Sequence, residues 1–108
     1  MKRLLISAAA LAALTTTAVA WSDQDRSELA FALGSILAAE DFCGLTFNQA
    51  AIEAFIGENV PAGDMHFSAQ LWLLTNGSKE SLKVMSESQL TAHCSQTRRV
   101  AAEYDLTE

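Results

Sequence analysis

Cys43 and Cys94 are the only two cysteines of the 108-residue chain, and their wide separation restricts the fold more than any other feature. A bond between them would close a loop of about 50 residues and stabilise the fold by roughly 4 kcal/mol on the chain-entropy estimate. That contribution is large, because a single core in a small domain leaves only a few kcal/mol of net stability. We therefore expect a structural Cys43–Cys94 disulfide. A redox-active thiol and an intermolecular bond are the alternatives, although the Cys-x-x-Cys motif of thioredoxin-like proteins is absent.

The oxidising compartment that such a bond needs is indicated by the first 20 residues, MKRLLISAAALAALTTTAVA. Two basic residues precede an apolar run, residues 4–14, that is too short to span a bilayer, and an Ala-Val-Ala sequence ends at Ala20. We expect residues 1–20 to be a secretory signal peptide and residues 21–108 to form a single domain that is periplasmic or secreted. No later apolar run approaches the length of a transmembrane helix, so we expect a soluble product without a membrane span.

Charge narrows the choice of partners. Without its first 20 residues the chain has 88 residues, with thirteen acidic and five basic side chains and a formal charge of −8. Nucleic acids and anionic membrane surfaces attract basic patches, so this acidity argues against both as partners. A basic protein or a cation would be compatible with it. We expect the partner to be another protein.

The chain after residue 20 is predicted to be helical throughout, because it has one proline, few β-branched residues and no sustained period-2 alternation. Gly44 and Pro61 are expected to follow the ends of the first and second helices, and Asp64 to cap a later one. Three further helix starts are predicted by sequences typical of capping boxes. They are Ser22–Asp25, Thr46–Gln49 and Ser86–Gln89.

Apolar residues recur at helical spacing and define the faces that we expect to be buried. In the first, second and last helices these faces are Leu29, Leu33, Ile36, Glu40 and Cys43; Ala51, Ile52, Phe55 and Ile56; and Leu90, Cys94, Thr97, Ala101 and Tyr104. Both cysteines lie on such a face, which suits a buried bridge better than an exposed nucleophile.

Between these helices a stripe from Phe67 to Met85 predicts one helix over residues 65–84, although a break at Gly77 is also possible because Asn-Gly-Ser is a stop signal. The tail from Asp105 is expected to be frayed. The expected fold class is all-α, a small bundle of four to five helices with one long-range disulfide.

Three residues are candidates for interaction with a partner. Trp72 lies in the apolar run LWLL, so we expect it to be buried; if it is exposed, it belongs to an interaction surface. Arg98 and Arg99 lie on the last helix near Cys94. We expect Arg98 to form an ion pair with Glu40 or Asp41, which the disulfide would bring close, and an anion-binding arginine pair is the alternative.

A metal site is not expected. Met65, His66, Met85 and His93 are soft ligands that would suit copper, but no two of them share close spacing on one helix face. His93 precedes Cys94, yet neighbouring side chains on a helix point about 100° apart, so we expect a surface or boundary histidine and no thiol–imidazole dyad. A Gly-rich phosphate loop, a Gly-x-Ser-x-Gly elbow and a His-Glu-x-x-His motif are all absent, so neither a cofactor nor an enzyme is expected.

Two segments, AAEDFCGLTFNQAAIEAFI and MSESQLTAHCSQTRRVA, resemble a group of small exported alphaproteobacterial proteins that share Phe-Cys-Gly-Leu-Thr and Thr-Ala-His-Cys. That resemblance implies no function. In architecture the chain is similar to the HdeA-type acid-stress chaperones of the periplasm, which are small all-helical proteins with one long-range disulfide. HdeA-like chains are lysine-rich, whereas only two lysines follow residue 20 here, and no site residue carries over.

The expected function is a non-catalytic binding or stress-related role outside the cytoplasm, chaperone-like under acid. Protonation of the carboxylates would change the charge from −8 to net positive, loosen the bundle and expose Trp72. The alternative is a periplasmic inhibitor or immunity protein that docks one dedicated partner, since electrostatic complementarity speeds association.

Overall fold

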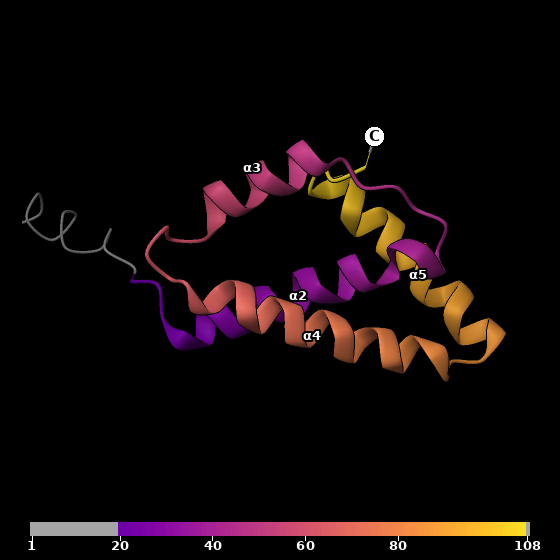
Figure 1. Cartoon of the computed structure of the whole chain (residues 1–108). Coiled ribbons are helices and arrows are strands. Elements are labelled where there is room, and N and C mark those ends of the chain that lie inside the picture. The colour runs from indigo at the N-terminus through magenta and orange to yellow at the C-terminus, as the bar shows by residue number, and fades with distance from the viewer. Residues whose placement is uncertain (1–19, 108) are drawn as a thin grey trace, which may run out of the picture.

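The computed structural model describes residues 20–107, which form four helices joined by short connections (Figure 1). Apart from Ala20, the predicted signal peptide lies outside the described residues. The all-α prediction is confirmed, with four helices and no fifth in the described part of the chain. These helices are α2 (Asp23–Phe42), α3 (Gln49–Asn59), α4 (His66–Lys83) and α5 (Glu87–Glu103). None of them has the length and apolar character needed to cross a membrane.

Two of the three predicted capping boxes are present. The side chain of Ser22 accepts a hydrogen bond from the backbone N–H of Asp25, and that of Ser86 accepts one from the backbone N–H of Gln89. In return, the side chains of Asp25 and Gln89 accept from the backbone N–H of the serine that caps the helix. These contacts satisfy backbone donors that the first turn of a helix leaves without partners.

The predicted Thr46–Gln49 capping box is wrong, because α3 begins two residues later than expected. Its N-cap is Asn48, whose side-chain oxygen accepts from the N–H of Ala51 at 3.1 Å. The preceding Phe47 is held in an isolated antiparallel bridge with Thr107 and cannot turn into a helix at the same time.

The prediction of one continuous third helix is confirmed, since α4 runs through Gly77 without a break. Its N-cap is Met65, not the expected Asp64, and Met65 makes no side-chain capping bond. Asp64 nevertheless serves the helix start, because its Oδ1 accepts from the N–H of His66 at 3.1 Å.

Helices α2 and α4 run parallel and side by side, with α4 along one edge of the molecule (Figure 1). Near their starts Ser27 Oγ accepts from Gln70 Nε2 at 2.9 Å, and near their ends Cys43 and Leu82 belong to one buried cluster. Midway, a Cβ on Gly34 would lie 3.2 Å from the backbone nitrogen of Thr75. Glycine at this position therefore allows the two helices to approach closely.

Helices α3 and α5 complete the fold on the other side of α2 (Figure 1). The aromatic rings of Phe55, on α3, and Tyr104, at the end of α5, contact each other, with their centroids 5.1 Å apart. The predicted face of α3 packs against the core but is only half-buried. The larger buried cluster contains Ala30, Leu33, Ile36, Phe47, Phe67, Ala101 and Leu106. The smaller one surrounds the disulfide and contains Ala38, Ala39, Cys43, Leu82 and Cys94.

The expectation of a frayed tail is wrong. Leu106 is fully buried in the larger cluster, and its carbonyl accepts from the N–H of Asn48 at 2.7 Å. The yellow C-terminal end in Figure 1 accordingly lies beside the start of α3. An apolar residue within reach of the core gains more from burial than it loses in chain entropy.

Candidate functional site

Two large apolar side chains project from the outer side of α4. Trp72 is 69% exposed and Leu73 is 63% exposed, whereas Leu71 and Leu74 are half-buried against the core. Successive residues of a helix point about 100° apart, so four consecutive apolar residues of α4 cannot all face the core. The prediction that Trp72 is buried is therefore wrong.

Trp72 and Leu73 line a shallow hollow on this side of the molecule. Phe42, from the end of α2, forms another part of its wall, and Lys79 and Lys83 lie on the same surface. We call these five residues the Trp72 surface. Lys83 also forms an exposed ion pair with Glu80 at 2.8 Å, which contributes little to stability but lowers the net positive charge of the surface.

An exposed tryptophan beside an exposed leucine is typical of a protein interaction site. Monomeric proteins seldom leave adjacent large apolar side chains in water, and aromatic residues are enriched in interfaces. The lysines can cover apolar surface with their methylene chains while their ammonium groups stay in water. The arrangement suits an apolar partner segment better than a small polar substrate.

A disulfide joins Cys43 to Cys94, with the two Cα atoms 5.4 Å apart, which confirms the predicted bridge. Both residues are buried, and the described residues include no free cysteine. The bridge fixes the middle of α5 against the end of α2.

Arg98 lies close to this bridge but does not form the predicted ion pair. Its Nη2 donates to the carbonyl of Cys43 at 3.0 Å, and neither Glu40 nor Asp41 pairs with it within residues 20–107. Glu40 instead accepts from the N–H of Phe47 at 2.9 Å. A guanidinium is attracted to the carbonyl groups that are left without partners at the end of a helix, here α2.

Arg99 does not share this contact. It is exposed and forms no ion pair within the described residues. The two arginines that the sequence places side by side thus differ: Arg98 completes the end of α2, and Arg99 is available to solvent.

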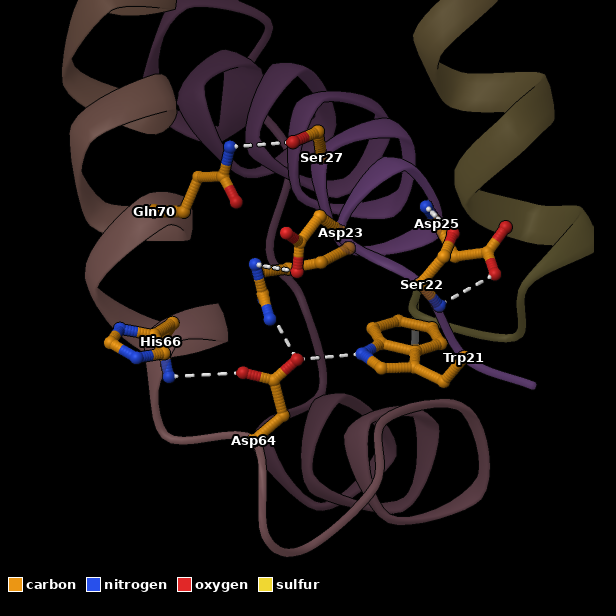
Figure 2. A network of polar contacts seen from close by, with 9 residues as sticks. Trp21, Ser22, Asp23, Asp25, Ser27, Asp64, His66 and Gln70 are labelled. Atoms are coloured by element: carbon orange, nitrogen blue, oxygen red, sulfur yellow. Dashed lines mark hydrogen bonds and ion pairs between the residues drawn. The ribbon is translucent and has the colours of Figure 1, made fainter.

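A polar cluster that the sequence did not predict lies at the opposite end of α2 (Figure 2). Asp64 Oδ2 accepts from Trp21 Nε1 at 2.6 Å and from Arg26 Nε at 2.7 Å. Only 8% of the Asp64 side chain is exposed, and the ring of Trp21 also packs 6.5 Å from that of Phe67. We call Trp21, Arg26 and Asp64 the N-terminal clasp.

The two charged groups of the clasp, Asp64 and Arg26, each stabilise the ionised form of the other. The hydrogen bond from Arg26, followed by that from Trp21, holds the pKa of Asp64 below its ordinary value of 3.8. The hydrogen bond to Asp64 in turn raises the pKa of Arg26, so both groups remain charged over the physiological range. The clasp connects residues that are 43 and 38 positions apart in the chain, so no local pattern could have revealed it.

The four residues considered as copper ligands lie in two places. Met65 and His66 are exposed at the start of α4, and Met85 and His93 line a pocket beside its last turns. Within residues 20–107 no three histidine, cysteine or acidic side chains gather as a metal site would require.

Comparisons with protein-family models, with curated proteins and with solved structures give no match for this chain.

Proposed function

We propose that this chain is a non-catalytic protein that acts outside the cytoplasm and binds other proteins through the Trp72 surface. The observation that carries the proposal is the exposure of Trp72 and Leu73 on a helix whose other side is packed. Burial of these two side chains against a partner would remove apolar area from water, which is the main favourable term in most associations.

Acid is the condition under which we propose that this role is strongest. Protonation of the carboxylates leaves a net positive chain, and the resulting repulsion loosens the contacts of a bundle that has a small core. The clasp resists this change longer than an ordinary carboxylate would, because the pKa of Asp64 is lowered. The disulfide does not titrate at all. A loosened but still connected bundle would offer more apolar surface to unfolding proteins.

The test is protection of a client from aggregation. Malate dehydrogenase brought to about pH 3 is expected to aggregate less in the presence of this protein, which should also bind the dye ANS there. Trp72→Ser should lose most of the protection while changing the free energy of unfolding by less than about 0.5 kcal/mol.

Met65→Ser is the matched control, since Met65 is 79% exposed but lies outside the Trp72 surface. It should protect the client as well as the wild type does. A wild-type protein that retains its full near-UV circular dichroism at about pH 3 and protects no client would refute the acid-chaperone role.

A role as inhibitor or immunity protein for one dedicated partner is the second candidate. It is favoured by Lys79 and Lys83, two of the five basic residues after residue 20, which give the Trp72 surface a charge opposite to that of the whole chain. Such a contrast selects a partner with matching carboxylates. A pull-down at neutral pH that recovers one stoichiometric protein, lost in Trp72→Ser, would favour this role over a general chaperone.

A further inference from the structure

Gly77 is a glycine within α4 that the packing of this chain does not require. Alanine stabilises a helix more than glycine does, and the backbone of Gly77 is helical, without the positive φ that would call for glycine. A Cβ on Gly34 would lie 3.2 Å from Thr75, whereas a Cβ on Gly77 would have no contact within 4 Å among residues 20–107 beyond its own helix backbone. The space beside Gly77 is therefore open to a partner.

This open space lies in the middle of the Trp72 surface. Gly77 lines the same hollow as Trp72 and Leu73. Leu73, Gly77 and Glu80 are all exposed and follow one another at the i, i+4, i+7 spacing of a single helix face. Glycine leaves a gap in this row of side chains. Helices pack by fitting the side chains of one into the gaps of the other, and glycine lets two backbones approach closely.

The lysines determine which charge is favoured at this surface. Lys79 forms no ion pair within the described part of the chain, and Lys83 pairs with the single carboxylate of Glu80, so the local charge is positive. Salt screens the more distant acidic residues beyond about 8 Å. Carboxylates of a partner would be attracted here. A second copy of this chain would bring the same two lysines and be repelled.

We propose that the Trp72 surface receives an amphipathic α-helix of a partner protein. That helix crosses α4 at Gly77, its apolar stripe covers Trp72 and Leu73, and its carboxylates face Lys79 and Lys83. An extended segment would need an exposed sheet edge to pair with, which a helical surface does not offer. The inference rests on the proposed docking function and adds the conformation and the charge of the segment that is bound.

The experiment measures the binding of fluorescein-labelled peptides to the disulfide-bonded protein at neutral pH by fluorescence anisotropy. The probe is a peptide of about 20 residues, long enough to form a helix, with leucines along one face and glutamates on both flanks of that face. One comparison peptide carries lysines in place of the glutamates, and another carries central prolines that prevent a helix. The glutamate peptide should bind about tenfold more tightly than either of them.

Gly77→Gln should weaken binding of the glutamate peptide about tenfold, because a long side chain fills the gap in α4. Gly57→Gln is the matched control. Gly57 also lies within a helix and has open space at its Cβ position, but it belongs to α3 and lies outside the Trp72 surface. Neither variant should unfold at lower urea than the wild type, since glutamine favours a helix more than glycine does. Gly57→Gln should bind the peptide like the wild type.

Trp72→Ser separates this inference from the proposed function. Unchanged binding of the glutamate peptide in Trp72→Ser would refute the docking surface and the helix together. Loss of binding in Trp72→Ser, with full affinity in Gly77→Gln and for the proline peptide, would leave the docking surface standing and overturn the helix.

Two further results would overturn the proposal. One is the absence of binding of the glutamate peptide at millimolar concentration. The other is a wild-type dimer in size-exclusion chromatography that becomes a monomer in Gly77→Gln, because the occupant would then be a second copy of this chain.

Discussion

The two ends of the parallel α2–α4 pair are closed by different chemistry. At the C-terminal ends, the Cys43–Cys94 bridge ties α5 to α2 covalently. At the N-terminal ends, the carboxylate of Asp64 gathers Trp21 and Arg26 by hydrogen bonds (Figure 2). The bridge stabilises the fold mainly by restricting the unfolded chain, whereas the clasp stabilises it only while Asp64 is charged. One closure is therefore independent of moderate changes in pH, and the other is not.

Removal of the Cys43–Cys94 disulfide is expected to have the largest effect on the free energy of unfolding. Cys94→Ser should lower the free energy of unfolding by roughly 2–5 kcal/mol, because the reduced chain regains the entropy of an open loop. Urea unfolding followed by circular dichroism would measure the loss, which should be similar at pH 5 and at pH 7. Cys43→Ser removes the same bond and should give the same value. A loss that differs strongly between the two variants would mean that one cysteine matters for packing beyond the bridge.

A smaller and pH-dependent effect is expected at the clasp. Asp64→Asn removes the negative charge that faces Arg26 and one of the two acceptor oxygens, which together serve Trp21, Arg26 and the N–H of His66, so the free energy of unfolding should fall at neutral pH. Because the pKa of Asp64 is lower in the folded state, its contribution is complete above about pH 4 and declines as the pH falls further through the lowered pKa. The stability difference between wild type and variant should therefore shrink in acid, as urea unfolding at a series of pH values would show.

Glu80→Gln provides the control for this comparison. Glu80 also belongs to an ion pair on the α4 side of the molecule, but its side chain is 72% exposed. Exposed pairs contribute little, so this variant should unfold like the wild type at each pH. An Asp64→Asn protein with the same stability as the wild type at neutral pH would show that the clasp is not a stabilising closure.

The smallest effect concerns the polar contact at the covalent end. Arg98→Ala removes the hydrogen bond to the carbonyl of Cys43 and should cost about 1 kcal/mol of unfolding free energy. Arg99→Ala should cost close to nothing, because Arg99 forms no ion pair within residues 20–107. Equal losses in the two variants would mean that general charge, and not the contact with α2, is responsible.

Two helix starts were predictable because capping depends on short-range rules, and the disulfide was predictable because the chain has only two cysteines. Ser22 and Ser86 each find their partners within three residues, so the capping boxes can be recognised in the printed sequence. Cys43 and Cys94 are the only possible pair within one chain, and each falls on an apolar stripe. Asn48 escaped prediction because Thr46 looks equally suitable locally, and only the bridge between Phe47 and Thr107 delays the helix.

The candidate site was predictable only in part. The sequence singled out Trp72 and Arg98, but the surroundings predicted for both were wrong. A run of four apolar residues does not say which of them face a neighbour. Leu71 and Leu74 pack inward because α2 lies there, and Trp72 and Leu73 are left exposed. Arg98 could reach several acceptors, and the carbonyl of Cys43 is the one that the end of α2 presents to it.

The sequence by itself determined that the chain is helical, where most of its helices begin and end, and that one disulfide closes a long loop. These properties follow from hydrogen bonds and apolar spacing within one or two helical turns, together with the pairing of only two cysteines. The tertiary structure alone decided that Asp64 joins Trp21 to Arg26, that Leu106 is buried and that Trp72 is exposed. Each of these outcomes depends on which helix lies against which, and that choice is made by the packing of the whole core.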